Sequence, residues 1–185
     1  MPRIIAGTAG GHRLQSPLGR DTRPTSDRVR EALFSRLEHE GLLDGTRVLD
    51  LYAGSGALGL EALSRGARAA VLVEQAATAV RVIRRNIGST RLAGATVLAD
   101  RVERVLAGEA GEPFDLVLAD PPYPLTEPAV AQVLMRLVDG GWLATPGVVV
   151  VERSARTPEP TWPPGLARYD ERRYGETRLW YAEHA

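Results

Sequence analysis

The chain has 185 residues, of which 44% are apolar, and its 23 basic residues are balanced by 23 acidic ones. This composition is typical of one globular domain and excludes a disordered tail and a collagen-like fibre. With no cysteine and three scattered histidines, disulfides, thiolate catalysis and sulfur-based zinc sites are excluded, and we expect no metal site. The longest apolar stretches, such as 147–151, are far too short for a membrane span, and the N-terminus lacks a signal-peptide core, so we expect a cytoplasmic protein.

All of the basic residues are arginine, whose planar guanidinium suits two-pronged contacts with phosphate. The first thirty residues contain six arginines against Asp21 and Asp27, a local excess of four positive charges. A basic patch on a neutral protein is more typical of selective than of general nucleic-acid binding. The phosphate contacts that we expect from this segment are Arg3, Arg13, Arg20 and Arg23.

The N-terminal residues predict a small extension. Two strand-like runs, 3–7 and 12–16, flank a glycine turn at 8–11, which is the pattern of a β-hairpin. We therefore expect an N-terminal β-hairpin and loop extension over 1–24 and a main domain over 25–185.

A helix opens the main domain. Thr25 or Ser26 provides its N-cap, Asp27 lies in its first turn and Gly41 ends it.

From residue 46 onward, short apolar strands alternate with helical patterns. Such alternation, with strands apolar on both faces, predicts a mostly parallel, doubly wound α/β sheet covered by helices on both sides. The runs 167–173 and 177–183 predict a closing antiparallel hairpin. The expected strands are 47–53, 69–74, 95–100, 114–120 and 147–152, and the expected helices are 57–65, 76–87, 101–107 and 127–139.

A glycine-rich turn at 50–59 follows the first strand of the main domain and opens a helix, so it matches the G-x-G-x-x-G pattern in the required setting. Ligands of open α/β sheets bind beyond the carboxyl ends of the strands. Glu74 ends the second strand, where a carboxylate can accept both ribose hydroxyls, and Asp100 ends the third, where it can accept an adenine amino group. Together these features predict a nucleoside site.

Two cofactors fit this pattern. NAD needs its pyrophosphate at the glycine turn, whereas S-adenosylmethionine carries no phosphate but has a sulfonium, an ammonium and a carboxylate. Asp50 lies four residues before the first glycine, where it would repel a pyrophosphate and favour a cation. This favours S-adenosylmethionine without excluding NAD.

The fourth strand ends in Asp120-Pro121-Pro122-Tyr123. The prolines stiffen the loop and remove two backbone donors, which leaves carbonyl oxygens free to face the site. The Asp120 carboxylate and the Pro121 carbonyl can accept the two hydrogens of an exocyclic amine and turn its lone pair toward a methyl donor. Tyr123 can stack on a flipped-out base, a contact worth about 1–3 kcal/mol.

Taken together, the glycine turn, the strand-end acids and the Asp-Pro-Pro-Tyr loop resemble class I S-adenosylmethionine-dependent methyltransferases with a Rossmann-like fold that act on planar nitrogens. Segments near both ends of the chain point to one family within this class. The segments 3–7, 23–34 and 174–181 are similar to those of the bacterial 16S rRNA guanine-N2 methyltransferase family. This resemblance covers nearly the whole chain.

The resemblance implies an enzyme that methylates the N2 amine of one guanine in 16S rRNA, within a small-subunit assembly particle and as a monomer. The implied catalytic residues are Asp120, Pro121, Pro122 and Tyr123. The implied cofactor-binding residues are Asp50, Tyr52, Gly54, Ser55, Gly56, Gly59, Glu74, Asp100, Arg101 and Asp120.

Other functions fit parts of the same pattern. Asp-Pro-Pro-Tyr is shared with DNA adenine methyltransferases, and a protein glutamine-amide methyltransferase would act on a similar planar nitrogen. The glutamine-amide enzymes more typically have Asn in place of Asp120, and DNA-modifying enzymes usually carry a target-recognition domain. An NAD enzyme or a non-catalytic nucleic-acid-binding module on a similar fold also remains open.

Overall fold

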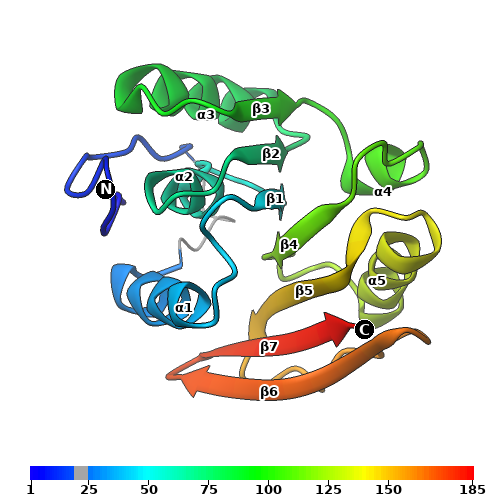
Figure 1. The fold of residues 1–185 in the computed structure, drawn as a ribbon. Helices are drawn as coiled ribbons and strands as arrows, with labels where there is room; N and C mark the ends of the chain where they lie inside the picture. The colour runs from blue at the N-terminus through cyan, green and yellow to red at the C-terminus, as the bar shows by residue number, and fades with distance from the viewer. Residues whose placement is uncertain (19–24) are drawn as a thin grey trace.

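The computed structural model describes residues 1–18 and 25–185. One seven-stranded sheet runs through the molecule, and Figure 1 shows helices on both of its faces. The strands, in spatial order, are β3 (Ala95–Leu98), β2 (Ala69–Val73), β1 (Arg47–Leu51), β4 (Phe114–Ala119), β5 (Leu143–Ser154), β7 (Thr177–His184) and β6 (Leu166–Tyr174). The helices are α1 (Asp27–His39), α2 (Ala57–Ser64), α3 (Ala77–Thr90), α4 (Val102–Leu106) and α5 (Glu127–Asp139).

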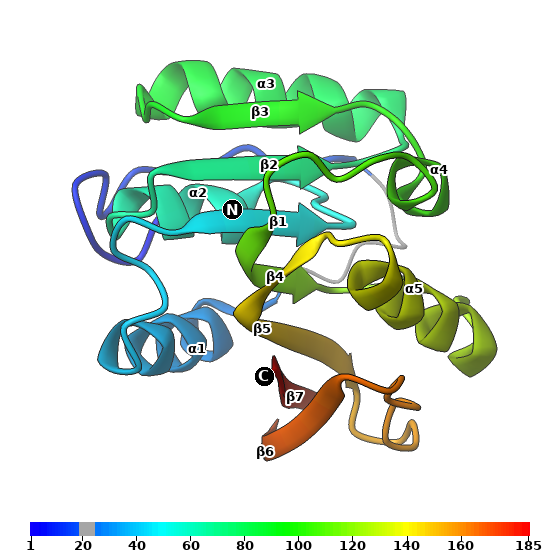
Figure 2. The ribbon, with the colours of Figure 1, turned by 45° about the vertical axis from the view of Figure 1, so that its right-hand side comes forward.

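The first five strands are parallel, and β7 pairs antiparallel with both β5 and β6. The arrows of β1 to β4 in Figure 2 accordingly point the same way. This confirms the mostly parallel, doubly wound sheet that ends in an antiparallel hairpin. Because the chain leaves β3 at one edge and returns to β4 beside β1, the order of the sheet reverses between β1 and β4. Ligands of open α/β sheets bind at such a reversal.

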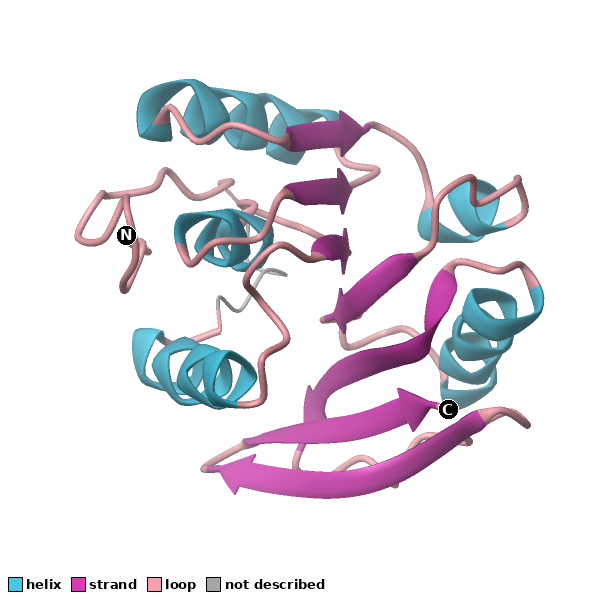
Figure 3. Ribbon diagram, in the orientation of Figure 1, coloured by secondary structure: helices cyan, strands magenta, loops and turns pink. Residues whose placement is uncertain are grey.

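Two apolar layers lie on opposite faces of the sheet, because successive strand residues point to opposite sides. On β1, Val48 packs with the layer under α1, α2 and α3, whereas Leu49 packs with the layer under α4 and α5. Figure 3 shows the same division, with α1 to α3 on one side of the strands and α4 and α5 on the other. Both faces of the central strands are therefore buried, as their continuous apolar runs predict.

Ser26 supplies the N-cap of α1: its hydroxyl accepts the Val29 N–H at 3.2 Å, and Asp27 lies in the first turn. The helix ends at His39, and Gly41 follows with a φ of +72°. The expected bounds of this helix are confirmed.

The N-terminal segment differs from the expected two-stranded hairpin. Its two arms pair over a shorter length than expected, through one antiparallel β-bridge between Arg3 and Arg13. Two backbone hydrogen bonds flank the bridge, from the Ile4 N–H to the His12 carbonyl at 2.9 Å and from the Leu14 N–H to the Pro2 carbonyl at 2.8 Å. The reason is that the N–H groups of Ile5 and Ala6 donate instead to the fully buried carboxylate of Glu61 on α2, at 2.7 and 3.1 Å. A side chain of the main domain thus takes the place of a partner strand at these two residues.

The same segment packs as part of the core. Ile4 and Leu14 are fully buried in the layer that includes α1 and α2. The N-terminal extension is therefore packed onto the main domain through these two side chains. Within residues 1–18 and 25–185, no helix is long and apolar enough to cross a membrane.

Candidate functional site

A cavity of about 570 Å³ opens where β1 and β4 end. Its walls come from the segments that follow β1, β2 and β4 and from the end of β5. The starts of α1 and α4, the turn between β6 and β7 and the N-terminal segment complete them. The expected site residues that line it are Tyr52, Gly54, Ser55, Glu74, Arg101, Asp120, Pro121, Pro122 and Tyr123. Most of the residues chosen from the sequence are thus brought to one place, at the reversal of the sheet.

Glu74 braces the glycine turn. Its carboxylate accepts the Gly54 N–H at 2.9 Å with one oxygen and the Ala76 N–H at 2.9 Å with the other. The turn needs left-handed backbone at Tyr52, Gly54 and Gly56, with φ of 59°, 58° and 82°. Tyrosine rarely adopts this conformation, and a strained non-glycine residue is a recurrent feature of functional sites. The turn and the second strand end are therefore locked together beside the cavity.

Asp50, Gly56 and Gly59 lie behind this turn and do not line the cavity. The Asp50 carboxylate is 1% exposed and accepts the Gly59 N–H at 2.9 Å. A Cβ added to Gly59 would lie 3.0 Å from Leu72, so this glycine lets α2 pack closely on β2. In the structure these three residues shape the turn from behind.

Asp100 also lies outside the cavity wall, and its carboxylate accepts the N–H of Arg101 at 2.8 Å. The two residues that follow it, Arg101 and Val102, do line the cavity. The third strand end thus reaches the cavity through the start of α4.

The end of β4 places Asp120 beside Glu152 of β5, because Ala119 and Val151 are paired in the sheet. The Thr25 hydroxyl lies 2.7 Å from Glu152 Oε2 and 3.4 Å from Asp120 Oδ2. A hydroxyl has one proton to donate, and the shorter distance assigns it to Glu152.

Burial and mutual repulsion control the protonation of these acids. Burial raises the pKa of Asp50 to about 7. The pKa of Asp120 lies well above its ordinary value, first because of burial and then because of the charges of Glu152 and Asp50. Burial also raises the pKa of Glu152. Crowded carboxylates that resist ionisation favour a bound cation, which would lower their pKa values.

Tyr123 extends from the same loop and is 55% exposed. Pro121 is buried and Pro122 is exposed, so the loop is anchored at its start while the aromatic ring is presented at the rim. The other tyrosine of the cavity, Tyr52, has a buried hydroxyl with no hydrogen-bond partner among the described residues.

Sequence reasoning missed Thr25 as a site residue, and it missed Glu152 and Arg153. Glu152 follows the rule that found the other acids, because it stands near the carboxyl end of a core strand. Thr25 is predicted from the sequence only as a helix cap. Arg153 is buried beside the cavity and donates to the carbonyl of Leu125 at 3.2 Å and to Glu127, which ties β5 to the Asp-Pro-Pro-Tyr loop.

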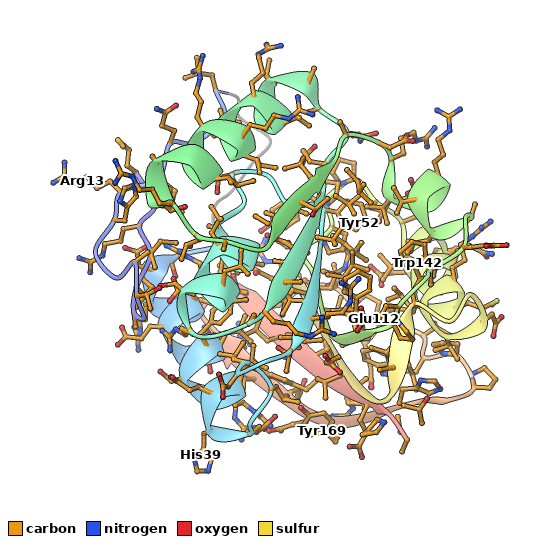
Figure 4. All side chains as sticks on the ribbon, turned by 45° about the horizontal axis from the view of Figure 1, so that its top comes forward. Arg13, His39, Tyr52, Glu112, Trp142 and Tyr169 are labelled. Atoms are coloured by element: carbon orange, nitrogen blue, oxygen red, sulfur yellow. The ribbon has the colours of Figure 1, made fainter. Side chains whose placement is uncertain are left out.

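Two of the expected RNA-contacting arginines, Arg3 and Arg13, do not line the cavity. Arg3 is exposed and lies 3.3 Å from the Asp27 carboxylate. Arg13 is also exposed, and Figure 4 shows it at the periphery, away from Tyr52. Arg20 and Arg23 lie outside the described residues.

Within residues 1–18 and 25–185, no group of three or more histidine or acidic side chains could hold a metal ion.

The strand order 3-2-1-4-5-7-6, with β7 reversed, and a braced glycine turn at the reversal define a class I methyltransferase fold. Magnesium protoporphyrin IX methyltransferase from Synechocystis, solved with bound S-adenosylmethionine, shares this fold with a TM-score of 0.66 over 85% of this chain and 79% of its own, at 14% identity.

The chain belongs to the family described as Conserved hypothetical protein 95, whose model matches residues 2–183. Ribosomal RNA small subunit methyltransferase D of Escherichia coli K12 is 35% identical over 183 residues, which cover 98% of this chain and 90% of that protein. The solved structure of the Escherichia coli protein yhhF has a TM-score of 0.87 and 32% identity, over 98% of this chain and 97% of that one.

Proposed function

We propose that this protein transfers a methyl group from S-adenosylmethionine to the N2 amine of a guanine in 16S rRNA of the small ribosomal subunit. The observation that carries the proposal is the placement of Asp120 and Pro121 beside the Glu74-braced glycine turn in one cavity. Membership of a family whose relatives include small-subunit rRNA methyltransferases supports the RNA substrate.

The charge of the cavity supports S-adenosylmethionine over NAD. Five carboxylates line it, those of Glu74, Glu103, Asp120, Glu152 and Glu176, against three guanidinium groups, those of Arg30, Arg101 and Arg153, and Asp50 lies just behind it. A pyrophosphate would be repelled there, whereas a sulfonium and an ammonium would be attracted. In this proposal Glu74 binds the ribose hydroxyls with the lone pairs that its two backbone contacts leave free.

The other expected cofactor contacts divide into direct and supporting ones. Tyr52, Gly54, Ser55 and Arg101 line the cavity and are proposed to touch the cofactor. Asp50, Gly56 and Gly59 are proposed to support it from behind the turn. We propose that the adenine amino group is read beside Asp100, at the start of α4.

The chain's own residues orient the amine. S-adenosylmethionine, when bound, supplies an activated methyl group, so no strong base is needed and positioning can provide much of the rate enhancement. The Asp120 carboxylate and the Pro121 carbonyl accept the two amine hydrogens and aim the lone pair at the donor. Asp120 has a raised pKa, which a bound cation would lower, so that its carboxylate would be ionised. The exposed Tyr123 ring stacks on the flipped-out base.

The RNA is proposed to extend from the cavity over the N-terminal segment, where Arg3 and Arg13 contact phosphates. We also propose phosphate contacts for Arg20 and Arg23, because they carry the same positive charge in the same part of the sequence. The substrate is proposed to be 16S rRNA within a small-subunit assembly particle, bound in the cytoplasm by a monomer of this protein.

The test is incubation of the purified protein with labelled S-adenosylmethionine and undermethylated small-subunit particles, followed by nucleoside analysis. We expect N2-methylguanine from the wild type, a loss of most turnover in Asp120→Ala, and much activity retained in Tyr123→Phe but not in Tyr123→Ala. Thermal unfolding of each variant shows that it remains folded. Formation of N6-methyladenine, or a near wild-type rate in folded Asp120→Ala, would contradict the proposal.

A further inference from the structure

Glu152 is a second carboxylate at the Asp120 end of the cavity, and the orientation of the amine does not require it. It lies on β5, next to Asp120, which follows β4, because the two strands are paired and end together. Thr25 is the only hydrogen-bond partner of its side chain among residues 1–18 and 25–185, and that contact engages Oε2. Oε1 is therefore available to a ligand in the cavity that Glu152 lines.

The Thr25 hydrogen bond favours the ionised form of Glu152 and opposes burial, which raises the pKa of this side chain. The hydroxyl donates at 2.7 Å to Glu152, whereas it lies 3.4 Å from Asp120. An ionised carboxylate only accepts hydrogen bonds. Glu152 thus presents an acceptor that a fixed threonine holds in place.

The edge of a flipped guanine fits two neighbouring carboxylates. Guanine carries hydrogens on N1 and on the adjacent N2 amine, so both atoms are donors. Adenine has its amine at position 6, and its N1 is an acceptor with a lone pair. An ionised carboxylate facing N1 would therefore bind guanine and repel adenine, and enzymes commonly read a flipped base through this edge.

We propose that Glu152 accepts the N1–H of the target guanine while Asp120 faces its N2 amine, and that Glu152 thereby selects guanine over adenine. This inference rests on the proposed function and deepens it. The Asp-Pro-Pro-Tyr loop alone fits any planar exocyclic nitrogen, so the choice of base needs a further group. Thr25 is a positioning residue that orients the Glu152 carboxylate.

The test replaces the target guanine in the RNA by 2-aminopurine, which keeps the 2-amino group but has an unprotonated N1. We expect the wild type to methylate the guanine RNA at least about 100-fold faster in kcat/KM, because sites that bind a donor reject analogues without it strongly. A wild type that treats both RNAs equally would overturn the inference without any mutation.

Glu152→Gln provides the reciprocal measurement. Glutamine can accept from Thr25 through its oxygen and donate through its amide nitrogen to the N1 of 2-aminopurine. The variant should therefore lose rate on guanine and gain rate on 2-aminopurine, a change of preference that a purely structural role would not produce. Thermal unfolding and cofactor binding establish that it is folded, and Glu183→Gln, an exposed position on β7, is the control that should keep the wild-type ratio.

The outcomes separate this inference from the proposed function. If the wild type methylates guanine and folded Glu152→Gln keeps the wild-type ratio, the role of Glu152 is wrong while the function stands. If the wild type transfers no methyl group to guanine in RNA or particles, both fail.

An independent observation concerns a basic face formed by α3 and the N-terminal segment. Neither α3 nor residues 1–18 contain an acidic residue. Within the part of the chain that the structure describes, five exposed arginines of this face have no carboxylate within 4.0 Å: Arg13, Arg81, Arg84, Arg85 and Arg91. The sequence alone favours simple solvation for the charges on α3.

Hydrogen bonds join this face to the site. Asn86 of α3 is buried and pairs with both backbone groups of Gln15, at 2.8 and 3.0 Å. Its amide also donates to the carbonyl of Ser55 in the glycine turn, at 2.8 Å. His12 contacts Ser89 at 3.0 Å. The face is thus one fixed surface that reaches the cavity wall.

We infer that this face binds the phosphate backbone of the RNA outside the target nucleotide. Arg84→Ala/Arg85→Ala should weaken RNA binding and lower the slope of log affinity against log salt by roughly 0.7 for each phosphate that is no longer neutralised, while calorimetry shows unchanged cofactor affinity. Arg136→Ala, on α5 across the sheet, is the matched control and should leave the slope unchanged. An unchanged slope in the folded double variant would overturn this inference and leave the proposed chemistry intact.

Discussion

Asp50 contributes to the pH dependence of this protein's unfolding free energy, and one substitution should remove that contribution. Its side chain is buried, and burial raises its pKa from the ordinary 3.8 to about 7. The folded state therefore holds this proton more tightly than the unfolded chain does. The carboxylate costs stability progressively as the pH rises from about 4 to about 7, and the full cost is present above pH 7. At 1.36 kcal/mol for each tenfold change in proton affinity, the full cost is about 4 kcal/mol.

Asp50→Asn keeps an oxygen for the Gly59 N–H and removes the charge. The variant should gain stability relative to the wild type by about 3 kcal/mol between pH 5 and pH 8, because the unfolded chain has already released most of its proton at pH 5. Urea denaturation followed by circular dichroism at both pH values measures this change. Asp139→Asn, which removes an exposed carboxylate at the end of α5, is the control and should follow the wild type. Equal pH dependence in Asp50→Asn and the wild type would refute the reasoning.

Three further predictions address the turn, the core and the cofactor. Gly59→Ala should cost about 1–3 kcal/mol of unfolding free energy, because its Cβ would crowd Leu72 at 3.0 Å. Gly88→Ala, in open space on α3, should instead gain about 0.5–1 kcal/mol. Urea denaturation measures both changes, and the reverse order of stability would contradict this prediction. Ile4→Ala should cost about 2–5 kcal/mol, whereas a negligible loss would show that the N-terminal segment is not part of the core. Glu74→Ala should weaken S-adenosylmethionine binding at least tenfold in calorimetry, and unchanged affinity, or equal binding of NAD by the wild type, would reject the assignment.

The sequence predicted the main elements because their signals are local. The strands of the parallel sheet are short β-branched runs between turn residues, and α1 begins at a capping serine followed by an acidic first turn. The glycine turn and the Asp-Pro-Pro-Tyr loop were found in the same way, since each follows directly from a strand. Parallel strands bring their carboxyl ends to one edge of a sheet, so a shared site could be expected before any distance was known.

The N-terminal hairpin shows where local signals fail. Its glycine turn was read correctly, but the N–H groups of Ile5 and Ala6 bond to Glu61, which lies 56 positions from Ile5 in the sequence. No short-range pattern identifies such a partner. The same limit applies to Asp100, whose position at a strand end was predictable but whose carboxylate accepts the N–H of Arg101 and does not line the cavity.

By itself, the sequence determined which strands and helices follow one another along the chain, the glycine turn and the acids at the strand ends. These features depend on periodicity and turn chemistry, which involve neighbouring residues. Only the tertiary structure decided which acids meet. Asp120 and Glu152 are 32 positions apart and become neighbours through the pairing of β4 with β5, and Thr25 reaches both from the other end of the chain. Strand pairing and burial are properties of the whole fold, and they set both the protonation of these carboxylates and the shape of the cavity that they line.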